Sequence, residues 1–92
     1  MPLRLDPSDT RPLPVQIAAA LRTQVAAGAL LPGERVASTR TLATQLGVSR
    51  GSVVTAYEQL TAEGYLTAEV GSGTVINPLL PHARATRPSI QG

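Results

Sequence analysis

Apolar residues recur at every fourth position in the first third of the chain. The members of this stripe are Leu13, Ile17, Leu21 and Val25. A four-residue spacing keeps apolar side chains on one face of an α-helix, so the pattern predicts an amphipathic helix over residues 12–27. Pro14 fits the first turn of such a helix, and Gly28 fits its C-terminal end.

Two shorter helices are predicted on either side of a very short connection. Ser38 and Ser49 can each cap a helix start with a side-chain hydroxyl, which predicts helices over residues 38–46 and 50–63. The predicted buried face of the second of these helices consists of Val53, Ala56, Tyr57 and Leu60. Little more than a glycine separates the end of one helix from the cap of the next. So short a connection is typical of a helix-turn-helix.

A glycine-rich turn follows the third helix. Residues 66–70 and 74–77 are predicted as two short strands around Gly71-Ser72-Gly73. A hairpin in this position is the wing of a winged helix-turn-helix. We therefore predict a mainly α fold with a small β-hairpin (α+β), made of three helices and a wing sheet of two or three strands.

The two ends of the chain lack this periodicity. Residues 1–11 are polar and contain two prolines, so we expect a flexible N-terminal arm. Residues 78–92 contain three prolines that would interrupt a helix, and we expect a linker or tail there. The winged domain itself is then expected over residues 12–77.

Composition narrows the function mainly by exclusion. The net charge of +2 fits a nucleic-acid partner and equally fits an ordinary, mildly basic domain. The chain has no cysteine, no lysine and one histidine, so nothing supports a disulfide, a metal site or catalysis, and we predict that it is not an enzyme. No apolar run approaches the length of a membrane span. We expect a soluble, cytoplasmic protein without a membrane partner.

The start of the third helix is the predicted reading surface. In a helix-turn-helix the second helix of the pair enters the major groove with its N-terminal residues at the base edges. Here that end is Ser49-Arg50-Gly51-Ser52. Free backbone N–H groups favour a phosphate there, and the Arg50 guanidinium can pair with O6 and N7 of guanine. Further along, Val54 and Thr55 could meet a thymine methyl, and Glu58 should either avoid the strands or accept from a cytosine amino group.

Other basic and glycine residues extend this surface, each with a structural alternative. Arg40 lies near a helix start, against the helix dipole, which favours a DNA contact. Arg35 follows Glu34, so a solvated ion pair is its alternative role. The wing glycines are turn residues that also make a tip narrow enough for a minor groove. The predicted DNA-binding residues are Arg35, Ser38, Arg40, Ser49, Arg50, Gly51, Ser52, Val54, Thr55, Gly71, Ser72 and Gly73.

The segment from Leu13 to Ile76 resembles the N-terminal domain of the GntR family of bacterial regulators. The phrases ASTRTLATQLGVSR, AYEQLTAEGYL and GSGT are most similar to the MocR subgroup of that family. The elements agree in order and spacing over about two-thirds of the chain. The resemblance implies a winged helix-turn-helix and sequence-specific binding of double-stranded DNA by a transcription regulator.

The resemblance also implies roles for single residues. It places Arg40, in STRTLA, at a base or an adjacent phosphate, Arg50, in GVSRGSV, at bases, and Ser52 on phosphate. The chain departs from the pattern where many relatives have a basic residue before the wing glycine and this chain has Glu69-Val70. It departs again at Val54, where some relatives have arginine. These departures imply a weakly binding wing and recognition that rests on the two arginines.

Regulators of the MocR subgroup continue through a linker into a large domain similar to fold-type I aminotransferases, which binds pyridoxal 5′-phosphate. The resemblance therefore implies that this chain is the DNA-binding portion of a longer, effector-responsive protein, with a complete small regulator as the alternative. No cofactor is expected in the chain itself, because it has no lysine to form a Schiff base.

Two functions from different classes follow for the fold. The first is operator binding as a homodimer, with half-sites about one or two helical turns apart, roughly 10 or 20 base pairs. The alternative is a winged-helix module for protein–protein contact, which would need an exposed apolar patch on the third helix. Val54 stands nearly alone as an apolar residue on that face.

Overall fold

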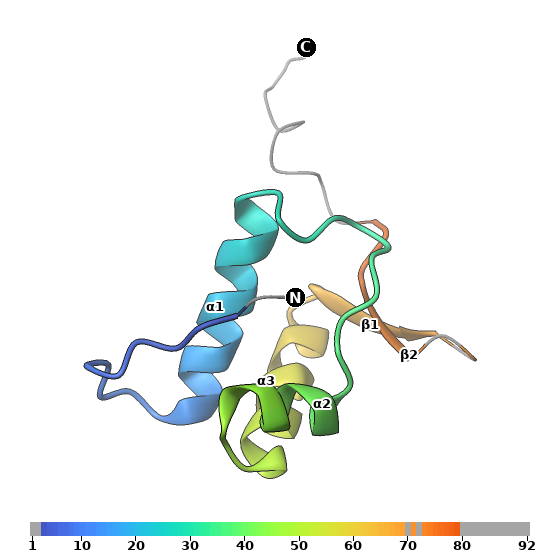
Figure 1. Ribbon diagram of the computed structural model, residues 1–92. Coiled ribbons are helices and arrows are strands. Elements are labelled where there is room, and N and C mark those ends of the chain that lie inside the picture. The colour runs from blue at the N-terminus through green and yellow to red at the C-terminus, as the bar shows by residue number, and fades with distance from the viewer. Residues whose placement is uncertain (1–2, 70, 72, 80–92) are drawn as a thin grey trace.

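The computed structural model describes residues 3–69, 71 and 73–79, and it contains the predicted helices and hairpin (Figure 1). The elements in chain order are α1 (Leu13–Ala26), α2 (Thr39–Leu46), α3 (Arg50–Ala62), β1 (Leu66–Glu69) and β2 (Gly73–Ile76). The helices gather on one side, and the hairpin projects away from them. The predicted fold class is therefore confirmed. Within the described residues, no helix combines the length and apolar character needed to cross a membrane.

The core lies between the three helices and the base of the hairpin. α3 is the central element, because it packs against α1, α2 and β1. The largest side chains that are almost fully buried are Ile17, Leu21, Leu42, Val53, Leu60 and Ile76. The predicted buried face of α3 is confirmed, since none of its four residues is more than 6% exposed. The α1 stripe is buried at its centre, whereas Leu13 at the first helical position stays 38% exposed.

Local capping chemistry fixes the turn between α2 and α3. The Ser38 and Ser49 hydroxyls accept hydrogen bonds from the backbone N–H of Thr41 and Ser52, at 3.1 and 3.2 Å. Each bond satisfies an N–H that has no partner inside its helix. Gly47 ends α2 with a φ of 70°, a conformation that glycine adopts without a steric penalty. The predicted helix-turn-helix is confirmed in these details.

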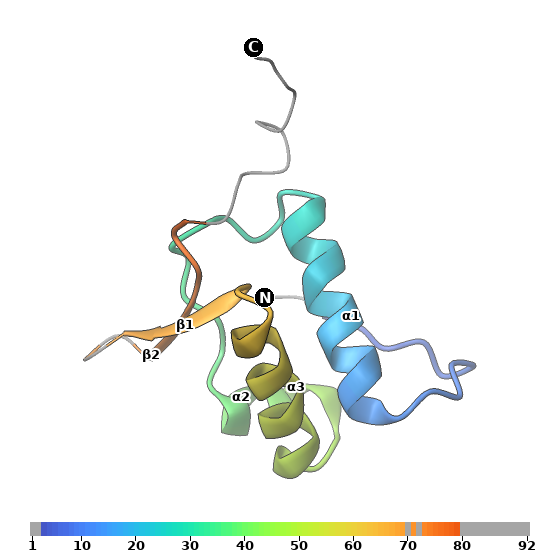
Figure 2. The same cartoon turned by 180° about the vertical axis from the view of Figure 1, so that it is seen from behind.

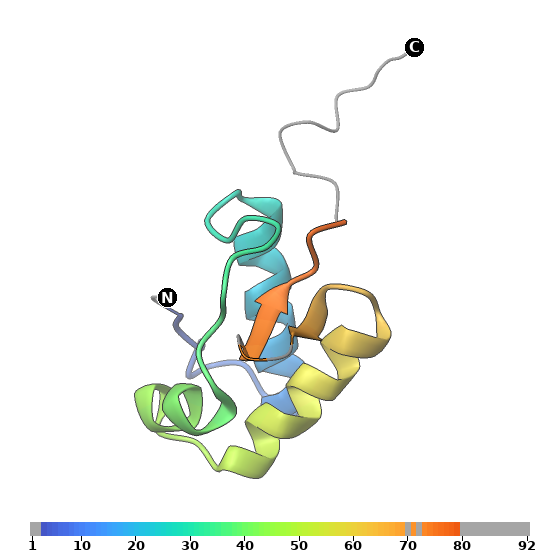
Figure 3. The same ribbon diagram turned by 90° about the vertical axis from the view of Figure 1, so that its right-hand side faces the viewer.

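The wing is a two-stranded antiparallel sheet with a short third edge. Leu66 pairs with Ile76 at its base, and Glu69 pairs with Gly73 near its tip. The segment before α2 joins β2 through a bridge between Arg35 and Val75. Figure 3 shows that segment running beside β2. The expectation of two or three strands is thus met by two strands and one bridge.

Residues 3–11, expected as a flexible arm, make contacts with the body of the domain. Leu3 and Leu5 pack against the core cluster. The side-chain amide of the buried Gln16 donates to the carbonyl oxygens of Asp9 and Arg11, at 3.2 and 2.6 Å. Figure 2 shows the segment looping beside α1. Apolar residues at alternate positions and a buried amide thus hold a stretch that composition alone describes as polar. Most of the predicted tail lies outside the described residues.

Candidate nucleic-acid interface

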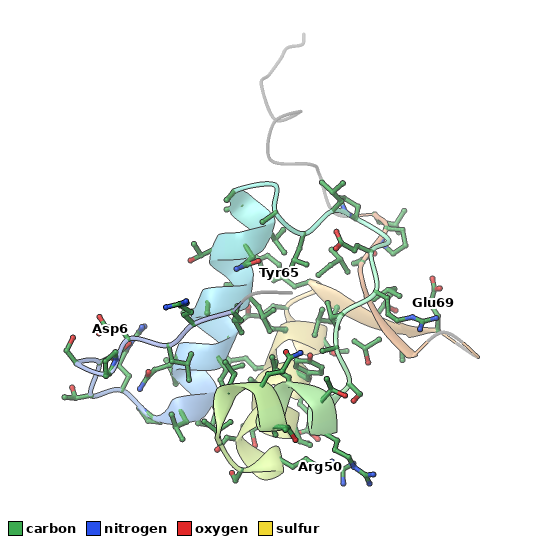
Figure 4. All side chains as sticks on the ribbon, viewed as in Figure 1. Asp6, Arg50, Tyr65 and Glu69 are labelled. Carbon is green, nitrogen blue, oxygen red and sulfur yellow. The ribbon has the colours of Figure 1, made fainter. Side chains whose placement is uncertain are left out.

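The leading end of α3 is open to solvent. The side chain of Arg50 is exposed and extends outward from the helix start (Figure 4). Its Nε donates a hydrogen bond of 3.2 Å to the Thr39 hydroxyl. Gly51 is exposed too, and a Cβ built on it would meet no atom within 4 Å. Ser52 is only half-buried, and its hydroxyl is 2.9 Å from that of Ser49. The four residues predicted to meet DNA are therefore together and accessible.

The outer face of α3 borders a hollow on its wing side. Thr55 is exposed and Val54 is half-buried. Glu58 is exposed, and within the described residues it has no ion pair. The hollow is lined by Thr39, Val54, Tyr57, Glu58, Thr61, Ala62, Ala68 and Thr74. Val54 therefore lies at the edge of a recess between the helix and the wing, rather than on a flat apolar patch.

A second groove joins the start of α2 to the wing. It is lined by Arg35, Val36, Ala37, Ser38, Thr39, Thr41, Gly71, Gly73 and Thr74. The fold thus brings Arg35 and Ser38 beside the two wing glycines, which come more than thirty residues later. Gly71 and Gly73 have φ values of 81° and 78°, as turn glycines do. Ser72, predicted at the same tip, lies outside the described residues.

The arginines of this face have no acidic partners in the part of the chain that the structure describes. Among the described residues, Arg11 forms a salt bridge with Asp9, and Arg22 forms a bidentate salt bridge with Glu63 through hydrogen bonds of 2.8 and 2.9 Å. Arg35, Arg40 and Arg50 are exposed, and no ion pair to any of them exists in the described part of the chain.

The anticipated pair between Glu34 and Arg35 does not form. The Glu34 carboxylate instead accepts a hydrogen bond of 2.9 Å from the backbone N–H of Leu31. The two paired arginines therefore lie away from the predicted DNA face, whereas Arg35, Arg40 and Arg50 on that face, like Arg4 beside α1, have no ion pair among the described residues. Glu69 on the wing is also exposed and unpaired within the described residues.

One polar contact of α3 was not anticipated. Tyr57 is buried, as predicted, yet its hydroxyl donates a hydrogen bond of 2.5 Å to the carbonyl oxygen of Ala37. Ala37 immediately precedes the cap of α2. Burial raises the pKa of the Tyr57 phenol from 10.0 to about 12, because the charged phenolate is poorly solvated there. The periodicity of α3 placed this ring in the core, but no local signal identified its acceptor.

The Tyr57 phenol makes domain stability sensitive to alkaline pH. Folding favours the neutral phenol, so its contribution is fully present below pH 10.0 and is lost as the pH rises to about 12. We expect the free energy of unfolding to fall by up to about 1.4 kcal/mol per pH unit across that interval. Urea unfolding of wild type and Tyr57→Phe at a series of alkaline pH values measures this component. The same pH dependence in both proteins would contradict it.

The comparisons with known proteins agree with this geometry. Residues 13–76 match the family model for bacterial regulatory proteins of the gntR family. The chain is 54% identical over 78 residues to the HTH-type pyridoxine biosynthesis transcriptional regulator PdxR of Corynebacterium glutamicum, covering 85% of the chain and 17% of that protein. It is 42% identical over 88 residues to the probable rhizopine catabolism regulatory protein MocR of Rhizobium meliloti, covering 96% and 18%. The chain thus spans less than a fifth of the length of these relatives.

Solved structures show the same fold. YtrA from Sulfolobus acidocaldarius, a GntR-family transcription factor, superposes with a TM-score of 0.77 at 31% identity, covering 85% of this chain and 82% of YtrA. The DNA-binding domain of AraR in complex with operator ORX1 superposes with a TM-score of 0.68 at 26% identity, covering 80% and 92%. A domain of this architecture thus binds operator DNA in the AraR complex.

Proposed function

The chain is a DNA-binding domain of the GntR family of bacterial regulatory proteins, and on this basis we propose how it recognises an operator. The leading end of α3 enters the major groove, with Arg50 at the base edges. Arg40 contacts a base or the adjacent phosphate, and the wing approaches the neighbouring minor groove. The observation that carries this proposal is the placement, on one face and beside two capped helix starts, of three exposed arginines that have no acidic partner among the described residues.

The groove between α2 and the wing is proposed to hold the DNA backbone. Arg35 and the Ser38 cap lie on one side of it, and Gly71 and Gly73 lie on the other. Backbone N–H groups at a helix start and a nearby guanidinium both favour a phosphate. Ser49, Gly51 and Ser52 are proposed to support close approach at the start of α3. A DNA contact by Ser72 is proposed from the sequence alone.

Val54 and Thr55 are proposed to provide apolar contacts to bases. Both lie on the outer side of α3 beyond its first turn, and both remain at least partly accessible. A thymine methyl is the base group that such side chains recognise. Val54 also lines the hollow beside the wing, so its contact would be limited to a base on that side.

The parent protein is proposed to be longer than this domain. Its relatives are transcription regulators of which the matched part is less than one fifth, and the domain itself is not an enzyme. An effector domain that binds pyridoxal 5′-phosphate is proposed elsewhere in the parent protein, on the ground of the resemblance to the MocR subgroup. We also propose that two copies act on a repeated operator, in the cytoplasm where the chromosome lies.

Salt dependence is the direct test of the proposed interface. If Arg35 and Arg40 each neutralise a phosphate, the association constant should fall about tenfold per half-site between roughly 50 and 200 mM salt, and about a hundredfold for two half-sites. The probe is a duplex selected from a random library by the 92-residue chain, and gel-shift titration measures the slope. Failure to retard any duplex at low salt would refute DNA binding and favour the protein-contact alternative.

A further inference from the structure

The segment that precedes α2 lies between three parts of the proposed DNA surface, which are the start of α2, the start of α3 and the wing. Within residues 33–36, the backbone N–H of Gly33 donates to Ile76 at 2.7 Å and that of Val36 donates to Thr74 at 3.0 Å. The next residues lead directly into the Ser38 cap and the first turn of α2. The segment is therefore fastened to the wing at one end and continues into a reading helix at the other.

In the described part of the chain, two side-chain hydrogen bonds join α3 to this segment and to the first residue of α2. One is the exposed bond from Arg50 Nε to the Thr39 hydroxyl, at 3.2 Å. The other is the bond from the Tyr57 hydroxyl to the Ala37 carbonyl oxygen, at 2.5 Å, from a side chain that is only 6% exposed. Because water competes with an exposed bond far more than with a buried one, the Tyr57 contact is the stronger constraint.

The position of this contact matters for α2. The helix has only eight residues, and its C-terminal end is already held by the tight turn at Gly47. Its N-terminal end, which bears Arg40 at the second helical position, is not joined to α3 by so short a connection. The Tyr57 hydroxyl holds the residue just before the cap, and so fixes that end relative to α3.

We propose that Tyr57 is a positioning residue for DNA recognition. Its hydroxyl holds Ala37 and thereby sets where Ser38, Arg40 and the attached wing lie relative to the leading end of α3. This inference rests on the proposed function, since it needs both helix starts to contact one duplex. Groups that support a recognition surface matter because small displacements of the contacting residues weaken several contacts together.

The Tyr57→Phe variant tests the proposal, because it keeps the buried ring and removes only the hydroxyl. The probes are the duplex selected by the wild-type chain and a shuffled duplex of the same composition. We expect the Kd for the selected duplex to rise by up to about tenfold, because binding must then restore the position of α2 that the buried hydrogen bond had fixed beforehand. The Kd for the shuffled duplex should change by less than about twofold, because nonspecific attraction to phosphates tolerates small displacements.

A matched control separates positioning from general stability. Gln16→Met also removes a buried side-chain donor to backbone carbonyl oxygens, but on α1 and the segment before it, away from α2 and the wing. It should lower the Tm to a similar extent and leave both Kd values unchanged. Thermal unfolding followed by circular dichroism identifies a temperature at which every variant is folded, and the titrations are carried out at that temperature. If a variant is only partly folded, the titrations are repeated in a stabilising osmolyte, which restores folding but not the missing bond.

A double-mutant cycle tests whether Tyr57 acts in part through Arg40. In an Arg40→Ala background, the Tyr57→Phe effect should be smaller than in the wild-type background, because one of the contacts that Tyr57 positions is already absent. The proposal is overturned if folded Tyr57→Phe binds both duplexes as wild type does, or loses affinity equally for both. A wild-type chain that binds no duplex would instead refute the proposed function itself.

Discussion

An Arg50→Ala variant is expected to lose about 1–3 kcal/mol of binding free energy on the selected duplex, roughly a 5- to 150-fold rise in Kd. The side chain is exposed and has no acidic partner among the described residues, so its loss leaves no buried group uncompensated. Preference for guanine at one operator position should disappear with it. Titration of the variant against a set of single-base variants of the duplex measures both effects.

The same substitution should not destabilise the fold. A positive charge at a helix N-terminus opposes the helix dipole, so its removal should stabilise α3 by up to about 1 kcal/mol. The single bond to the Thr39 hydroxyl lies at the surface and offsets this gain only slightly. A weaker DNA complex formed by an equally or more stable protein is therefore the expected signature, which thermal unfolding can establish.

Arg4→Ala provides a matched control for charge. Arg4 is exposed in the segment beside α1 and has no ion pair among the described residues. Its removal lowers the net charge by the same amount, but it should leave base preference unchanged. Arg40→Ala should lose a similar amount of binding free energy on the selected duplex, about 1–3 kcal/mol. If the Arg40 and Arg50 variants both bind as wild type does, the assigned reading surface is wrong.

The features predicted correctly from the sequence are those set by neighbouring residues. The Ser38 and Ser49 caps act within three residues, and Gly47 supplies its own backbone conformation. The buried face of α3 follows from helical periodicity over the eight residues from 53 to 60. Because each of these signals is local, the order and bounds of the helices could be inferred without knowledge of the packing.

The features that the sequence did not indicate depend on distant partners. Tyr57 donates to a carbonyl twenty residues away, and Arg22 pairs with Glu63 across forty-one positions. Leu3 and Leu5 acquire their packing role only when α1 and the core are assembled. Periodicity can state that a side chain is buried, but not which backbone group it meets. The exposed residues of the candidate site could be proposed individually, whereas their grouping around two hollows required the structure.

Leu60→Ala is expected to have the largest effect on stability. Leu60 is 1% exposed and lies on the buried face of α3, the helix that packs against α1, α2 and β1. Truncation of such a leucine costs about 2–5 kcal/mol, from lost burial and from the cavity that remains. The total stability of a domain this small is on the order of 5–10 kcal/mol. The Tm should therefore fall by at least about 10 °C, as circular dichroism would measure.

Leu13→Ala is the control for this prediction, because it removes the same atoms from a position that is 38% exposed. It should cost less than about 1 kcal/mol, since less apolar surface returns to water and no enclosed cavity forms. DNA binding by Leu60→Ala should weaken only in proportion to its unfolded fraction and should recover when an osmolyte restores folding. Equal losses of stability from the two substitutions would contradict the assignment of α3 as the centre of the core. They would also contradict the view that this core rigidly supports the starts of α2 and α3.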